Sequence, residues 1–183
     1  MFKRFTQEEH VSSNSAVKSS VQRTIRAKIL ESYPHAHTMI DEVLPKKGAN
    51  ITIAKCSNHL SLICKDNVIM FFQERDGPIF PTLRLLHQYP YLMTKMQVDK
   101  GAIRFVMNGS HIMCPGFTSP GGAMEEPVEA GAPVAVMAEG KGHALAVGTT
   151  MLSREDIREK NNGVAVESIH YLGDGLWDLQ ELD

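Results

Sequence analysis

The amino-acid sequence predicts an α+β protein with N-terminal helices on a small antiparallel sheet, followed by a small, closed or nearly closed β-barrel. Three features support this prediction. Apolar residues recur at four-residue steps from Val17 to Ile29, a period of two begins at Ile51, and short strand-like runs separated by glycine turns fill the second half. We place the domain boundary near Thr94, which gives domains of residues 1–94 and 95–183.

The first domain is expected to open with helices. Residues 1–14 read as a lead-in segment. Ser19 and Gln22 have the spacing of a capping box, which predicts that a helix begins there, and Pro34 is expected to end it. A second short helix is predicted over residues 37–44. The apolar face of the first helix comprises Val17, Val21, Ile25 and Ile29.

A three-stranded antiparallel meander is predicted next. Apolar and polar residues alternate over residues 51–56, 60–64 and 68–72, and Ser57-Asn58 and Asp66-Asn67 have turn chemistry. A short helix is then expected over residues 82–89, before Pro90.

The second domain is predicted to be rich in short strands. The expected elements are a strand at 96–98, a helix at 101–107, a turn at Asn108-Gly109, a strand at 111–114, a long loop at 115–122, strands at 134–138 and 144–151, a helix from Ser153 to Asn161, and strands at 164–171 and 176–179. Glycine turns at 140–142 and 173–175 join the paired strands.

The composition is that of a globular protein, and its charge is divided unevenly. The chain has 183 residues, 43% hydrophobic and 22% charged, with a net charge of -2. Residues 1–94 carry 12 Lys and Arg and 8 Asp and Glu, whereas residues 95–183 carry 7 and 13. The first domain therefore suits contact with phosphate, and the second can accept RNA only in a local groove. Unpatterned variation of surface charge explains the same division.

Compartment and redox state follow from two further features. No run of 18 apolar residues exists, and Glu8 and Glu9 stand where a signal peptide would be apolar, so we expect a cytoplasmic protein without membrane contact. The three cysteines, Cys56, Cys64 and Cys114, include no Cys-x-x-Cys pair and are expected to be reduced thiols in the core.

The sequence contains no recognisable catalytic set. Gly140-Lys141-Gly142 lacks the residues of a phosphate loop, and His35 and His37 lack further metal ligands. His87 and His170 are expected to be structural, and Asp174 and Asp178 to shape a turn. We therefore predict no enzyme activity, no catalytic residue, no metal and no cofactor.

Three features suit RNA better. Lys100 and Arg104, near Lys95, are spaced to face one phosphate track, although a solvated helix face explains them equally well. Residues 107–111 lack bulk in the middle, which allows close backbone approach. Phe117 in a small, polar loop can stack on a base or serve as a buried anchor. The basic residues of the first domain are dispersed.

The second domain resembles the opening of PUA domains. Residues 98–106 (VDKGAIRFV), Gly109 and residues 112–116 (IMCPG) carry this resemblance. Across nearly the whole chain, the sequence resembles the malignant T-cell-amplified sequence family. This wider resemblance rests on the start MFK and on residues 80–87 (FPTLRLLH), 118–121 (TSPG), 137–141 (MAEGK), 169–172 (IHYL) and 174–177 (DGLW).

The resemblance implies a fold, partners and candidate sites. It implies a pre-PUA type N-terminal domain, a PUA-like β-barrel, density-regulated protein as partner, and action on the small ribosomal subunit in reinitiation, non-standard initiation and post-termination recycling. The PUA domain resembles modules that bind RNA, including transfer-RNA acceptor ends. The RNA groove of PUA domains maps onto Lys100, Arg104, Asn108, Gly109, Ser110, His111, Gly116, Phe117, Thr118 and Ser119. The basic residues expected to contact ribosomal RNA are Lys3, Arg4, Lys18, Arg26, Lys46, Lys47, Arg75 and Arg84.

The sequence departs from the family at Ser110, Phe117, Gly173 and residues 124–133, which affects the detail of the loop contacts rather than the fold. Two other functions stay open: an accessory RNA-binding subunit of a transfer-RNA or ribosomal-RNA modifying enzyme, and a protein-interaction scaffold without RNA contact. Ser119-Pro120 fits a proline-directed kinase site, but so short a pattern is better explained as a turn.

Overall fold

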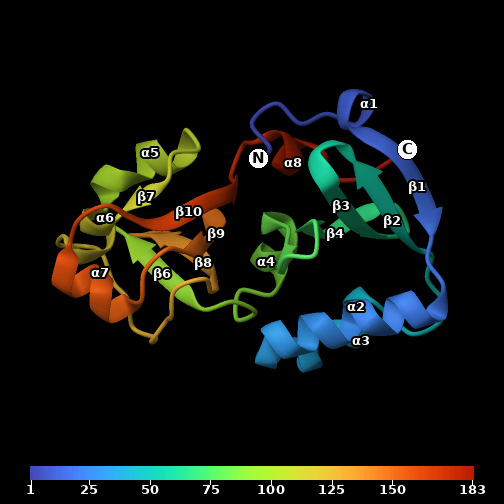
Figure 1. Cartoon of the computed structure of the whole chain (residues 1–183), viewed down its shortest axis with the longest axis horizontal. Helices are drawn as coiled ribbons and strands as arrows, with labels where there is room; N and C mark the ends of the chain where they lie inside the picture. The colour runs from blue at the N-terminus through green and yellow to red at the C-terminus, as the bar shows by residue number, and fades with distance from the viewer.

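Two five-stranded sheets organise the chain, and the computed structural model describes residues 1–183 (Figure 1). The first sheet is wholly antiparallel and has the strand order β1-β2-β3-β4-β5. Its strands are β1 (Val11–Ala16), β2 (Ile51–Cys56), β3 (Leu60–Lys65), β4 (Val68–Glu74) and β5 (Ile79–Pro81). The helices of this part are α1 (Gln7–His10), α2 (Ser19–Ser32), α3 (Ile40–Val43) and α4 (Leu83–Gln88), with 3-10 turns at Pro34–Thr38 and Ser57–His59.

The second sheet is mixed and curled, with the order β6-β8-β9-β10-β7. Its strands are β6 (Lys95–Val98), β7 (Ile112–Met113), β8 (Pro133–Ala138), β9 (Ala146–Thr150) and β10 (Val164–Tyr171). Its helices are α5 (Ile103–Met107), α6 (Cys114–Thr118), α7 (Arg154–Lys160) and α8 (Gly175–Asp178), with a 3-10 turn at Lys100–Ala102. The α+β class and the PUA-like second sheet are confirmed. Because β6 and β7 do not pair, the barrel is a half-barrel.

Most predicted elements are present, but several expectations were wrong. The predicted three-stranded meander is extended by β5 on one side and by β1 on the other. Residues 1–14 include α1 and most of β1, which escaped detection because a strand exposed on both faces shows no alternation. Ser19 does not cap α2, because it is the first residue of the helix and Lys18 holds the N-cap position. The Gln22 side chain, predicted to complete the capping box, donates to the Pro45 carbonyl. The expected loop at 115–122 begins as α6, with Pro115 in its first turn. The expected strand at 176–179 is α8, capped by Asp174, so the glycine turn at 173–175 joins a strand to a helix and is not a hairpin.

Hydrophobic residues form two cores, and the end of the chain joins the first of them. Leu176 and Leu182 pack with the first sheet, and Gly175 N–H donates to the Phe2 carbonyl at 2.8 Å. Farther along, Leu182 N–H donates to the Asn67 carbonyl at 2.9 Å. We propose a domain boundary at residue 94, with residues 175–183 packing back against the first domain. None of the helices is both long and apolar enough to cross a membrane.

A buried hydrogen-bond network joins the two halves at His170. Leu83 N–H donates to His170 Nε2 at 3.1 Å, which leaves the ring proton on Nδ1 to be donated to Asp174 at 2.8 Å. The Asp174 carboxylate also accepts from the N–H groups of Tyr171 and Trp177. His170 is fully buried, so it is structural, as expected.

A second contact between the halves is a stack of side chains around Trp177. The Arg84 guanidinium lies 4.0 Å from the Trp177 ring centroid, the His87 ring lies 5.4 Å from the same residue, and His143 lies 4.8 Å from His87. The His87 ring also donates to the Ala144 carbonyl at 2.8 Å. Burial is the main cause that holds the pKa of His87 below its ordinary value of 6.5, and the Ala144 hydrogen bond opposes it.

We expect this contact to weaken in acid. The pKa of His87 is lower in the folded protein than in the unfolded chain, so the unfolded chain binds the proton more readily. The contribution of neutral His87 to the free energy of unfolding is therefore complete above pH 6.5 and declines as the pH falls below that value. Urea unfolding followed by fluorescence of the single tryptophan measures this at about pH 7.5 and about pH 5.5. His87→Gln should reduce the difference between the two pH values, and an unchanged difference would contradict the assignment.

Candidate nucleic-acid interface

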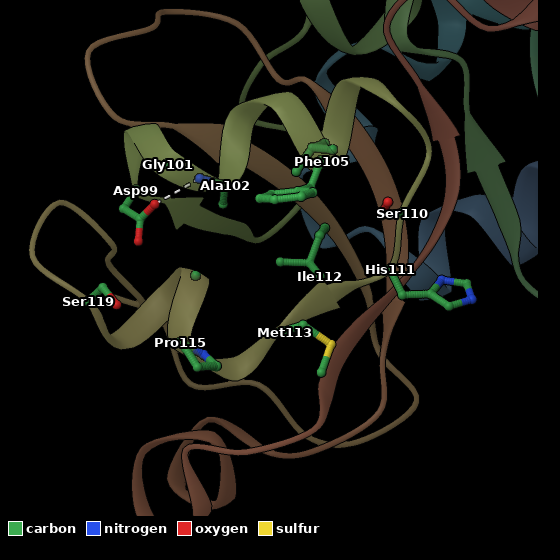
Figure 2. Close-up of a pocket in the computed structure, with 12 residues that line it drawn as sticks. Asp99, Gly101, Ala102, Phe105, Ser110, His111, Ile112, Met113, Pro115 and Ser119 are labelled. Carbon is green, nitrogen blue, oxygen red and sulfur yellow. Dashed lines mark hydrogen bonds between the residues drawn. The ribbon is translucent and has the colours of Figure 1, made fainter.

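An open groove of about 550 Å³ lies in the second half (Figure 2). The 3-10 turn at Lys100–Ala102 and α5 form one wall, and β7 and α6 form the other. The lining residues are mostly apolar or small: Asp99, Gly101, Ala102, Phe105, Val106, Ser110, His111, Ile112, Met113, Pro115, Gly116 and Ser119. Asp99 anchors the first wall, because its carboxylate accepts from Ala102 N–H at 2.9 Å.

Phe105 is the main aromatic surface of the groove. Its side chain is 50% exposed, and Figure 2 shows the ring lying above Ile112 and Met113. The Arg104 guanidinium lies 4.8 Å from the Phe105 ring centroid, which places a cation beside the ring. Sequence reasoning missed Phe105, because a phenylalanine between Ile103 and Val106 reads as a core residue.

Asp99 is the one acidic residue that lines the groove, and the nearby cations lie outside the lining. No lysine or arginine lines it, whereas Lys100 and Arg104 are exposed on the segment that forms its first wall. An apolar, aromatic surface is suited to the face of an unpaired base, and cations at the rim are suited to the phosphates beside it.

The structure brings together part of the predicted groove set. Ser110, His111, Gly116 and Ser119 line the groove, and Lys100 and Arg104 flank it. Asn108, Gly109 and Thr118 of the set do not line the groove. Asn108 and Gly109 form the turn after α5, and the Thr118 hydroxyl donates to the Asn161 side chain.

Phe117 cannot be the stacking residue in this structure. Its side chain is only 2% exposed and belongs to the second core. The reason is that residues 114–118 form a helix, which turns Phe117 inward. Of the two interpretations of Phe117, the buried anchor is correct.

Gly109 allows Tyr171 to pack closely against the turn after α5. Its φ is +82°, and a Cβ there would lie 2.6 Å from the Tyr171 ring. Gly109→Ala should therefore lower the free energy of unfolding by about 1–3 kcal/mol through backbone strain and steric clash. Thermal unfolding measures this. Gly142→Ala is the matched control, since nothing lies within 4 Å of its Cβ position. Equal melting temperatures for the two variants would contradict the packing role.

Two of the eight basic residues predicted in the first domain are unavailable to phosphate. Arg26 is 7% exposed, pairs with Asp41 at 2.5 Å and donates to the carbonyls of Ile40 and Leu44. Arg84 is half-buried and donates twice to the Trp177 carbonyl, at 3.0 and 2.9 Å. Both side chains are long enough to reach backbone acceptors, which sequence spacing does not reveal.

The six other basic residues, Lys3, Arg4, Lys18, Lys46, Lys47 and Arg75, are exposed. Lys18, Lys46 and Lys47 lie together at the N-terminal end of α2. Gln22 links the two segments: its N–H donates to the Lys18 carbonyl, and its side chain donates at 2.5 Å to the carbonyl of Pro45, which precedes Lys46. We name Lys18, Lys46 and Lys47 the helix-end patch. Lys3, Arg4 and Arg75 lie on other segments.

Other reactive side chains do not gather into a site. No group of three His, Cys, Asp or Glu side chains could hold a metal ion. All three cysteines are free thiols, and burial raises the pKa of Cys56 and Cys64 to about 11. Such thiols are predominantly protonated at neutral pH and are poor nucleophiles.

The two halves match two known domain families. The Pre-PUA-like domain model matches residues 5–90, and the PUA domain model matches residues 94–172. The fold and the groove therefore define a PUA-domain protein. Malignant T-cell-amplified sequence 1 homolog of Drosophila melanogaster is 53% identical over 180 residues, 97% of each chain, and malignant T-cell-amplified sequence 2 of Homo sapiens is 44% identical over 98% of each chain.

This chain belongs to the malignant T-cell-amplified sequence family, as its resemblance indicated. Solved structures agree on the fold. A hypothetical protein from Pyrococcus horikoshii superposes with a TM-score of 0.75 at 24% identity, covering 92% of this chain and 99% of that one. A PUA domain structure from Aeropyrum pernix gives 0.67 at 26% identity, covering 91% and 90%. The family and the PUA domain support an RNA-binding, translation-related protein.

Proposed function

We propose that this protein is a non-enzymatic, cytoplasmic RNA-binding translation factor. It acts with density-regulated protein on the small ribosomal subunit in reinitiation, non-standard initiation and post-termination recycling. The observation that carries the RNA contact is the half-exposed Phe105 ring in an apolar groove, with Lys100 and Arg104 at its rim. The ribosomal setting and the protein partner rest on the family.

The RNA contact that fits the groove is an unpaired base. Stacking of a base on an aromatic side chain contributes about 1–3 kcal/mol, and an unpaired base exposes the face that stacking needs. A single-stranded 3′ end, such as a transfer-RNA acceptor end, supplies such bases. Lys100 and Arg104 then contact the adjacent phosphates.

Binding by several weak contacts is consistent with this arrangement. The helix-end patch lies in the other half of the molecule and offers a second, sequence-tolerant contact for ribosomal RNA. Contacts made together by the groove, the patch and density-regulated protein reinforce one another through effective concentration. The protein thus acts by positioning its partners. The His170–Asp174 pair, which resembles an acid–base dyad, is buried, and both side chains are engaged in structural hydrogen bonds.

Cosedimentation with purified small ribosomal subunits tests this function. The protein is incubated with small subunits, with and without density-regulated protein, at rising salt, and with large subunits as the control. We expect selective binding to small subunits that weakens with salt, because phosphate contacts release counterions. Absence of small-subunit binding under all these conditions would overturn the ribosomal assignment.

Charge reversal at the rim tests the RNA contact separately. We expect Lys100→Glu with Arg104→Glu to lower the affinity for single-stranded RNA and to reduce the slope of log affinity against log salt by about 0.7 per lost phosphate contact. Fluorescence anisotropy with a labelled oligonucleotide measures both. Lys141→Glu, on the exposed turn before β9, is the matched control. An unchanged salt slope would favour a protein scaffold without RNA contact.

A further inference from the structure

The two sheets have four edges, and β1 differs from the other three. β5 has three residues, ends in Pro81 and is buried. β7 has two residues, and β6 is covered on its outer side, where Gln97 and Ala123 exchange backbone hydrogen bonds at 2.8 and 2.9 Å. β1 has six residues, of which five are exposed, and contains neither a charge nor a proline. Figure 1 shows β1 at the outer rim of the molecule.

The register defines which backbone groups of β1 face outward. Val17 N–H donates to the Ile51 carbonyl at 3.1 Å, so these two residues form a hydrogen-bonded pair. Hydrogen-bonded pairs recur at every second residue of an antiparallel ladder, and Ser15, which is paired with Ile53, is the next one. The residues between these positions, Asn14 and Ala16, therefore direct their N–H and C=O groups away from β2. A bulge near Ser12 interrupts the pairing only at the start of the strand. Natural proteins usually protect such an edge with lysine, proline, a β-bulge or a covering element. Within β1 only the bulge is present, and it leaves the stretch from Ser13 to Ala16 in regular register.

Unpaired charges lie at both ends of this edge. Glu8 and Glu9 precede β1, Lys18 follows it, and all three are exposed and make no ion pair. A strand that adds antiparallel to β1 would bring its N-terminal end beside Lys18 and its C-terminal end beside Glu8 and Glu9. The matching segment is therefore extended, acidic at its N-terminal end and basic at its C-terminal end.

We propose that β1 is a docking edge for an extended segment of a polypeptide partner, which adds as an antiparallel sixth strand next to Asn14 and Ala16. A second copy of the chain fits less well, because a contact between two short polar edges buries far less than the roughly 1,000 Å² that a stable interface needs. A segment tethered to a partner that is already bound elsewhere does not need that area. This proposal is independent of RNA binding in the groove.

A synthetic peptide with blocked ends tests the edge. Threonine and valine alternate in its middle, two aspartates precede them and two lysines follow. In titrations followed by amide NMR, we expect shifts concentrated at residues 10–18 and slower hydrogen exchange at the Asn14 and Ala16 amides. A peptide with the aspartates and lysines exchanged should bind more weakly.

Substitutions at Asn14 separate the backbone from the side chain. Asn14→Pro removes an outward N–H that the ladder does not use, so the fold should persist while peptide affinity falls at least tenfold. Asn14→Ala keeps the N–H and should bind normally. Ala16→Pro gives a second test if Asn14→Pro does not fold.

Three results would overturn the proposal. The first is the absence of β1 shifts at millimolar peptide, and the second is equal binding by Asn14→Pro and Asn14→Ala. The third is a dimer in sedimentation that Asn14→Pro abolishes, because it would identify a second copy as the occupant.

Discussion

Phe105→Ala is expected to weaken the binding of single-stranded RNA by about ten- to a hundredfold. The ring is the main exposed aromatic surface of the groove, and the loss of one stacked base costs about 1–3 kcal/mol. The fold should be little affected, because half of the side chain already contacts solvent. Phe105→Tyr keeps the aromatic face and should retain most of the affinity.

Fluorescence anisotropy with short labelled oligonucleotides measures this effect. Met151→Ala is the matched control, because Met151 is also 50% exposed but does not line the groove. Fully double-stranded RNA should bind both variants alike, since its bases are not free to stack. If Phe105→Ala bound single strands as tightly as the unaltered protein, the groove would not be the base-binding surface.

Asp174→Ala is expected to give the largest loss of stability, about 3–5 kcal/mol. The substitution removes the carboxylate of a residue that is 2% exposed, and it leaves two buried donors and one partly buried donor without an acceptor. It also frees the His170 ring, which connects the second half to Leu83 at the start of α4. Such a loss is a large part of the 5–15 kcal/mol typical of a folded domain.

Urea unfolding at neutral pH measures this loss of stability. Asp178→Ala is the control, because Asp178 lies on the same short helix but is exposed, and its effect should stay within about 0.5 kcal/mol. Asp174→Asn should lie between the two, since one amide oxygen can still accept hydrogen bonds. Similar unfolding midpoints for Asp174→Ala and Asp178→Ala would show that the network does not join the halves.

Elements with strong local signals were predicted correctly. The alternation at Ile51–Cys56 and the cap at Ser153, which accepts from Asp156 N–H, depend on neighbouring residues alone. Elements defined by distant partners were missed. β1 is a strand because it pairs with β2, and β2 begins at Ile51, 35 residues beyond the last residue of β1, Ala16. A single sequence shows no local sign of that pairing.

The candidate site shows the same division. The resemblance to PUA domains mapped a groove onto ten residues between Lys100 and Ser119, and four of them, Ser110, His111, Gly116 and Ser119, line the cavity. The resemblance did not show which phenylalanine, Phe105 or Phe117, exposes its ring in the groove. Both Phe105 and Phe117 lie in short helices, and only packing against the second sheet buries one and exposes the other.

Periodicity, turn residues and motifs are local, so the amino-acid sequence was enough to predict the α+β class, most of the strands, the family and the segment that forms the groove. Which charges and rings are available depends on the folded chain. Folding places Arg26 and Arg84 on backbone carbonyls, brings Lys18 beside Lys46 and Lys47, and returns the tail to the first sheet. Burial and hydrogen-bond partners involve segments that are far apart in the chain, and local sequence patterns do not reveal them.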